Sequence, residues 1–161
     1  MRLSPLMASL VLLLASCSPG AGEASPAADQ TAPAVHPASG LAVVPLTVTS
    51  GKTRHIFRVE LAATAAQQAR GLMFRTALGA DEGMIFPMNP PRAASFWMRN
   101  TVIPLDLIFV GPDGRITNIA ANAVPYDETP LSSTGLVKGV LELSGGRAAQ
   151  LGIVAGDRVE W

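Results

Sequence analysis

The strongest constraint on the fold comes from residues 105–110, LDLIFV, because this segment is apolar on both faces except at Asp106. Successive side chains alternate across a β-strand, so Asp106 shares a face with Ile108 and Val110. Strands that are covered on both faces form nearly continuous apolar runs of this kind. The segment therefore predicts a buried strand. Residues 95–99, SFWMR, predict a strand before it, and Pro104, which has no amide hydrogen, suits the start of the second strand.

Asp106 needs a partner or a cavity, because burying an unpaired charge costs several kcal/mol. One interpretation is structural: the carboxylate accepts hydrogen bonds from the loop before it, or pairs with an arginine. The other makes Asp106 the polar floor of a ligand pocket that Trp97 walls. The residues expected to bind a ligand are Trp97, Asn100, Thr101 and Asp106, with Arg70 and Arg75 as the arginines near a predicted helix.

The N-terminus has the layout of a secretion signal, with Arg2, a short apolar segment at 6–15 and small residues before Cys17. The apolar segment is too short to cross a bilayer core of about 30 Å as a helix. Residues 14–17, LASC, resemble a bacterial lipobox, in which the cysteine is acylated and becomes the first residue after cleavage. Cys17 is also the only cysteine, which excludes an intrachain disulfide. We expect a lipid anchor at Cys17; the alternative is a plain signal peptide that contains a cysteine.

The chain after Cys17 divides into a tether and one domain. Ser18, in place of an aspartate, favours the periplasmic face of the outer membrane by resemblance to enterobacterial sorting. Residues 18–43 are rich in Ala, Pro, Ser and Gly and predict a disordered tether. Residues 44–161 have the length of one modest domain. The formal net charge is 0 and no basic cluster occurs, which argues against nucleic acid as a partner. The expected partners are the membrane, through Cys17, and a small molecule or an envelope protein.

The domain is predicted to be mainly β (α+β), a single compact, antiparallel-rich sheet or barrel-like domain with two short helices. Thr64 and Gln67 match a capping box before a helix at 65–70, and Gly71 would end it. A second helix is predicted at 147–151. Strands are predicted at 45–50, 54–62, 84–88 with an end at Pro87, 105–110, 115–124, 136–144 and near Val159. In the strand at 136–144, Glu142 is predicted to lie on the surface of a half-buried strand.

Five blocks in fixed order carry a family resemblance: GLMFR at 71–75, GMIFPM at 83–88, FWMRNTVIPLDLIFV at 96–110, VLELSGG at 140–146 and LGIVAGDRV at 151–159. Together they resemble the family known as domain of unknown function 192. The resemblance covers nearly the whole predicted domain, and its most specific part is the Trp97 to Asp106 block. It implies a compact, mostly β fold, often secreted or lipid-anchored in bacteria. It implies no established activity.

The residues favour a binding domain over an enzyme. The predicted domain has one histidine, His55, so neither a nucleophilic triad nor a zinc site is readable, and no metal, cofactor or catalytic residue is predicted. One alternative is an envelope glycan hydrolase that uses Asp106 and Glu142, which requires two carboxyl groups roughly 5–9.5 Å apart. Another is a copper(I) carrier, because thioethers favour cuprous ions; its ligands would be Met73, Met84, Met88 and Met98. A purely structural domain is the third.

Overall fold

The computed structural model describes residues 34–161, so the predicted signal, Cys17 and most of the predicted tether lie outside the described residues. Residues 34–42, at the end of the predicted tether, form a hydrogen-bonded turn. In this turn the amide of His36 donates to the carbonyl of Leu41 at 2.8 Å, and Val35 bridges Ala42. Within the described range no helix is long and apolar enough to cross a membrane.

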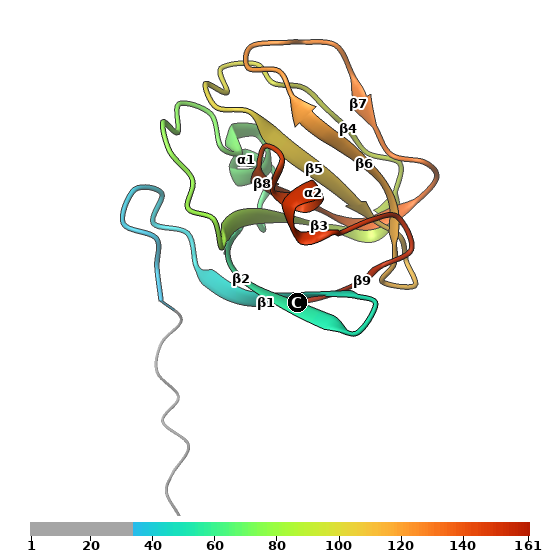
Figure 1. The fold of residues 1–161 in the computed structure, drawn as a ribbon. Coiled ribbons are helices and arrows are strands. Elements are labelled where there is room, and N and C mark those ends of the chain that lie inside the picture. Colours follow the sequence, from blue (N-terminus) through green and yellow to red (C-terminus); the bar gives the residue numbers. More distant parts are fainter. Residues whose placement is uncertain (1–33) are drawn as a thin grey trace, which may run out of the picture. The chain divides into compact units, whose positions relative to one another are not determined.

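Within residues 34–161, nine strands and two short helices follow one another (Figure 1). In chain order they are β1 (Val43–Ser50), β2 (Thr53–Leu61), α1 (Ala65–Arg70), β3 (Glu82–Arg92), β4 (Ser95–Phe96), β5 (Leu105–Val110), β6 (Ile116–Ala123), β7 (Leu131–Ser132), β8 (Val137–Ser144), α2 (Arg147–Leu151) and β9 (Arg158–Glu160). The prediction of a mainly β domain with two short helices is confirmed. Both helices have the predicted bounds, and α1 has the predicted capping box at Thr64 and Gln67.

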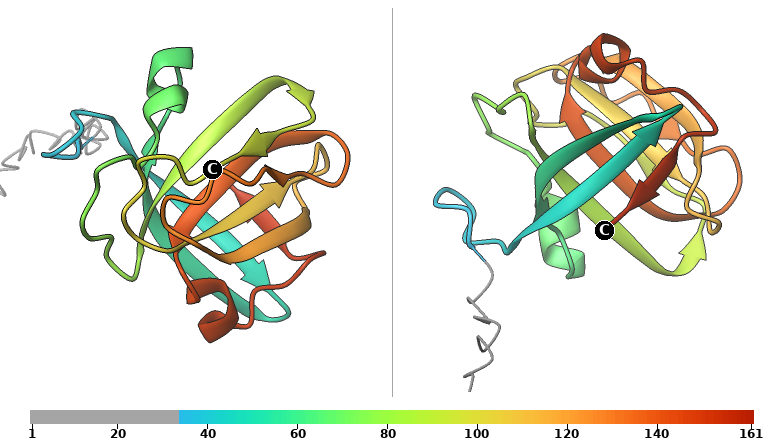
Figure 2. Two further views of the ribbon diagram at one scale, coloured as in Figure 1. Left: turned by 90° about the horizontal axis from the view of Figure 1, so that it is seen from above. Right: turned by 60° about the horizontal axis from the view of Figure 1, so that its bottom comes forward.

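Seven strands form one mixed sheet in the order β6-β5-β8-β3-β2-β1-β9, and β4 and β7 form a separate pair. All neighbours in the large sheet are antiparallel except β2 and β3. The sheet curls strongly (Figure 2), and a single bridge between Arg115 and Arg158 links its two ends. It is not a closed barrel.

Two predicted strands differ from the structure. The strand at 95–99 shrinks to Ser95–Phe96, which pairs only with β7 and not with the large sheet. Conversely, β3 does not end at Pro87 but continues to Arg92, with an irregular register against β8 between these two residues. A proline lacks only the donor, so its carbonyl and neighbours can still continue a strand where the ladder is irregular.

Apolar side chains cover both faces of the central strands and form two cores. The first core lies on one face and includes Phe57, Ile85, Ile108, Leu141 and Leu143. The second core lies on the other face and is built mainly by Leu72, Met84, Phe86, Met88, Met98, Leu105, Leu107, Phe109 and Val140. β5 is buried along its whole length, as its sequence predicts. β8, which lies between β5 and β3, is buried on both faces too, so the prediction of a half-buried strand is wrong.

Candidate functional site

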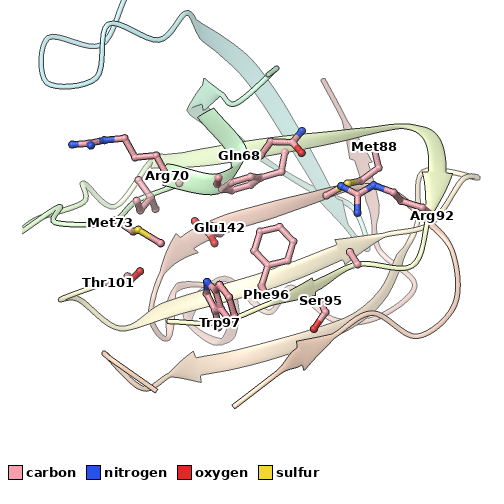
Figure 3. A pocket seen from close by; sticks show the side chains of 15 residues that line it. Gln68, Arg70, Met73, Met88, Arg92, Ser95, Phe96, Trp97, Thr101 and Glu142 are labelled. Carbon is pink, nitrogen blue, oxygen red and sulfur yellow. The ribbon is translucent and has the colours of Figure 1, made fainter. Parts of the chain in front are cut away.

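A cleft of about 270 Å³ opens into the second core (Figure 3). Its volume is near the lower end of the roughly 300–1,000 Å³ typical of ligand sites. One wall is the end of α1 with the residues after it, from Gln68 to Met73, and the opposite wall is the segment from Ala94 to Trp97 with Thr101. Glu142 on β8 projects into the cleft between these walls. Segments that lie far apart in the sequence therefore meet around one carboxyl group.

Glu142 is the chemically unusual group of the cleft. Its side chain is only 5% exposed, and its Oε2 atom has no hydrogen-bond partner among the described residues. Removal from water penalises the charged form, and this burial raises the pKa of Glu142 from 4.5 to about 8. At neutral pH the group is therefore mainly a neutral carboxylic acid, which can both donate and accept a hydrogen bond. The prediction that Glu142 lies on the surface is wrong.

The rest of the lining combines aromatic rings, thioethers and polar groups. Phe86 and Phe96 meet edge to face, with ring centroids 5.1 Å apart, and close the apolar side of the cleft. Gln68 is held in place because its Nε2 donates to the carbonyls of Ala62 and Pro87, at 3.1 and 2.9 Å. Figure 3 shows the exposed Arg92 beside Met88 at one end of the cleft. The cleft thus offers both a hydrocarbon surface and hydrogen-bonding groups to a ligand.

Asp106 lies outside the cleft and has a structural role. It is fully buried, and its Oδ1 accepts from the amides of Asn122 and Gly146 at 2.8 and 2.9 Å, while Oδ2 accepts from the amide of Ala148 at 2.8 Å. Gly146 is the N-cap residue of α2 and has no side chain to cap the helix, so Asp106 supplies the missing acceptor from β5. The interpretation of Asp106 as the pocket floor is therefore wrong. The structural interpretation holds in outline, but the partners predicted for Asp106, the loop at 100–103 and an arginine, are wrong.

The two predicted arginines have other roles. Arg75 pairs with the buried Glu60, with Nη2 2.9 Å from Oε1, and its Nη1 lies 3.2 Å from Nε2 of His36. This contact holds the 34–42 turn against the domain, because Ser39 also bonds Glu60. Arg70 lines the cleft, but its guanidinium lies 6.0 Å from the Phe74 ring centroid. Neither arginine is a counter-ion for Asp106.

The remaining predicted ligand residues lie at the cleft. Trp97 and Thr101 line it directly. Asn100 does not, but its Nδ2 lies 3.9 Å from the sulfur of Met73, which does. Gln68, Arg92 and Glu142 are cleft residues that the prediction of binding residues did not include. Glu142 had the same signal as Asp106, a carboxylate within an apolar run, VLEL.

The geometry does not assemble the predicted hydrolase pair. Glu142 stands opposite Leu107 across the strand pair, and Asp106 opposite Leu143. Cross-strand partners share a face and successive residues alternate, so the two carboxyl groups project from opposite faces of the sheet.

A metal site is not evident either. Among residues 34–161 no three His, Cys, Asp or Glu side chains gather as metal ligands would. Of the four methionines of the copper alternative, Met73 and Met88 line the cleft, whereas Met84 and Met98 are buried and are not part of its lining.

A second hollow, of about 650 Å³, lies on the other side of the α1 segment, and Arg70, Gly71 and Met73 belong to both linings. The 34–42 turn contributes Ala38, Ser39 and Leu41 to it. Its Arg75 is already paired with Glu60. We therefore regard the Glu142 cleft as the candidate site.

Comparison with known proteins identifies relatives of this chain. The family model DUF192, described as an uncharacterized ACR, matches residues 46–161. A protein of unknown function from Novosphingobium aromaticivorans, known from a crystal structure, is 66% identical; the match covers 87% of this chain and 100% of that one, with a TM-score of 0.79. A protein from Sinorhizobium meliloti described as a "putative transcription regulator" is 38% identical over 74% of this chain and 94% of its own, with a TM-score of 0.72. No curated protein matches the chain.

Proposed function

We propose, from the premise that this chain belongs to the DUF192 family, that it is a cell-envelope protein whose domain binds a small polar ligand in the Glu142 cleft. The observation that carries the proposal is the unpartnered Oε2 atom of Glu142. A buried polar atom without a partner costs roughly 1–3 kcal/mol. Such a group is retained most readily where a ligand completes its hydrogen bonds.

The other buried carboxylates of the domain support this interpretation by contrast. Asp106 receives three backbone amides, and Glu60 receives Arg75 and Ser39. The fold therefore provides partners for buried carboxylates where they serve structure. Of these three carboxylates Glu142 faces the cleft, and since no group within residues 34–161 bonds its Oε2 atom, we infer that a ligand supplies the partner. His55, whose Nε2 is also buried and unpartnered, lies on β2 and does not line the cleft.

The lining defines the ligand in outline. A hydroxyl, amide or amine would bond Glu142, while the Phe86 and Phe96 rings would cover an apolar face of the same molecule. Arg92 would add charged donors at the end of the cleft, since no salt bridge of Arg92 occurs within residues 34–161. A protein segment that inserts one side chain would meet the same groups.

The test is a nuclear magnetic resonance screen of the ¹⁵N-labelled protein against a library of small alcohols, amides and amines. We expect hits that shift the Trp97 indole and Gln68 amide signals, and we expect Glu142→Gln to change their affinity at least about fivefold. Glu160→Gln, which alters an exposed carboxylate on β9, is the matched control and leaves the affinity unchanged. The proposal would be refuted if all hits bind away from the cleft, or if Glu142→Gln leaves their affinity unchanged.

The envelope location is a separate part of the proposal and rests on the N-terminal sequence. The apolar segment and the LASC residues that end at Cys17 support lipid attachment there. An acyl chain contributes roughly 0.8 kcal/mol per buried methylene, so two or more chains hold a protein at a membrane surface. We expect cells fed radioactive palmitate to label the wild type but not Cys17→Ala, and the variant to leave the membrane fraction. Equal labelling of both proteins would exclude Cys17 as the attachment site.

We do not extend the regulator description of the Sinorhizobium protein to this chain. The formal net charge is 0, with 12 basic and 12 acidic residues, whereas DNA-binding surfaces concentrate positive charge. Our expectation of no nucleic-acid partner would be overturned by salt-dependent binding to duplex DNA.

A further inference from the structure

Three loops meet beside the cleft and present one aromatic residue each. The amide of Phe74 donates to the carbonyl of Asn100 at 2.8 Å, and the amide of Tyr126 donates to the carbonyl of Met98 at 3.1 Å. These bonds join the loops around residues 74, 100 and 126. Trp97, which lines the cleft, is the immediate neighbour of Met98. We call Phe74, Trp97 and Tyr126 the aromatic rim.

The rim side chains are exposed although they are large. Phe74 is 61% exposed, Trp97 51% and Tyr126 63%. In addition, Phe74 and Tyr126 have φ angles of 63° and 64°, in a region that bulky residues rarely adopt. Strained backbone conformations of this kind concentrate at binding and catalytic sites. Exposure and strain together indicate a surface that is shaped for contact.

Charges of both signs are interleaved with the rings. The Cζ atom of Arg99 lies 5.9 Å from the ring centroid of Trp97, and its Nε lies 3.6 Å from Oε1 of Glu128. The Cζ atom of Arg70 lies 6.0 Å from the ring centroid of Phe74. Mixed charge of this kind does not favour an anionic lipid surface or nucleic acid, both of which select for positive charge. It does favour an uncharged or weakly charged polar molecule that also has apolar faces.

We propose that the cleft and the aromatic rim together bind a saccharide chain, with one sugar ring in the cleft beside Glu142 and further rings against Trp97 and its neighbours. This inference rests on the proposed function of the cleft. A sugar ring has polarised C–H groups on its faces, which the negative face of an aromatic ring attracts, and hydroxyl groups on its edges. A carboxyl group and guanidinium groups beside the rings match those hydroxyls, because both form several directed hydrogen bonds. Phe74 and Tyr126 do not line the cleft, so a sugar ring that contacts either of them while another ring occupies the cleft belongs to a chain.

The experiment is isothermal titration calorimetry of the full chain in detergent micelles at pH 7. The probes are the monomers and linear tetramers of N-acetylglucosamine, glucose and mannose, all of which are uncharged. We expect at least one tetramer to bind about tenfold more tightly than its monomer. Phe74→Ala and Tyr126→Ala, at rim residues that do not line the cleft, should remove most of that gain. Trp97→Ala and Glu142→Gln should weaken the binding of monomer and tetramer alike. Ile56→Ala, an exposed apolar residue on β2 that does not line the cleft, is the matched control.

The outcomes separate this inference from the proposed function. Tight tetramer binding that depends on Phe74 and Tyr126 supports a saccharide chain as the ligand. If the tetramers bind no more tightly than the monomers, or if both rim substitutions leave the affinity for the tetramers unchanged, the aromatic rim is not part of the site. If no saccharide binds while the small-molecule screen finds ligands that depend on Glu142, the saccharide inference is wrong and the proposed function stands. If the screen also finds none, both fail.

Discussion

The pH dependence of stability is the most direct consequence of the buried Glu142. Its pKa rises from 4.5 in the unfolded chain to about 8 in the folded one, so the native state holds the proton more tightly. The stability associated with this group is therefore complete below pH 4.5 and is lost as the pH rises toward 8. Between these two pH values the contribution of Glu142 to the free energy of unfolding should fall by about 1.4 kcal/mol per pH unit.

Glu142→Gln isolates this effect because glutamine has nearly the same shape and does not titrate. Between pH 5 and pH 8 the variant should gain about 3.5 kcal/mol relative to the wild type, since each pH unit contributes about 1.4 kcal/mol except close to the two pKa values, where the slope is smaller. At pH 7 the variant is then the more stable protein by about 3 kcal/mol. An increase in the free energy of unfolding when a buried ionisable group is removed is expected for a residue that is kept for function at the expense of stability.

Urea denaturation of both proteins at pH 5, 6, 7 and 8 measures the difference directly. Other carboxyl groups titrate in both proteins and cancel. Glu160→Gln, at an exposed position, controls for the loss of one negative charge and should follow the wild type at every pH. A difference between wild type and Glu142→Gln that stays constant from pH 5 to pH 8 would refute the argument, because it would mean that Glu142 is solvated or paired.

Three further substitutions test the structural contacts, each by thermal and urea denaturation at pH 7. Asp106→Asn should lower the free energy of unfolding by about 3 kcal/mol, because the amide NH₂ group that replaces one carboxylate oxygen faces a backbone N–H donor. An unchanged melting temperature would contradict the proposal that Asp106 holds the N-terminus of α2 in place. Glu60→Gln should lower the free energy of unfolding by about 3 kcal/mol, because the ion pair with Arg75 is lost, and it should increase protease cleavage within residues 34–42. Unchanged cleavage would show that other contacts hold this turn in place. Thr64→Ala should lower stability by about 1 kcal/mol by removing the N-cap of α1, and a neutral effect would mean that the helix end is held by packing alone.

Local signals in the sequence predicted the helices and most strands well. The bounds of α1 follow from Thr64, Gln67 and Gly71, which act within one or two turns of the chain. The burial of β5 follows from a run of residues that is apolar on both faces. The family blocks from Gly71 to Val159 identified the family before any fold was known.

The partners of the buried carboxylates could not be predicted in the same way. Asp106 is bonded by amides from residues 122, 146 and 148, which lie 16 to 42 positions away along the chain. Arg75 pairs with Glu60, which Ser39 of the 34–42 turn also bonds, and not with Asp106. Hydrogen-bond partners at such separations depend on strand order, which no local pattern determines.

Glu142 shows the division most clearly. The sequence by itself determined that a carboxylate stands among apolar residues in a strand, and it determined the same for Asp106. Only the tertiary structure decided that β8 is a central strand, that Asp106 and Glu142 face opposite sides, and that the cleft of the candidate site opens on the Glu142 side. The physical reason is that alternation along a strand determines which residues share a face, whereas the segments packed on that face determine whether a buried charge meets amides or a cavity.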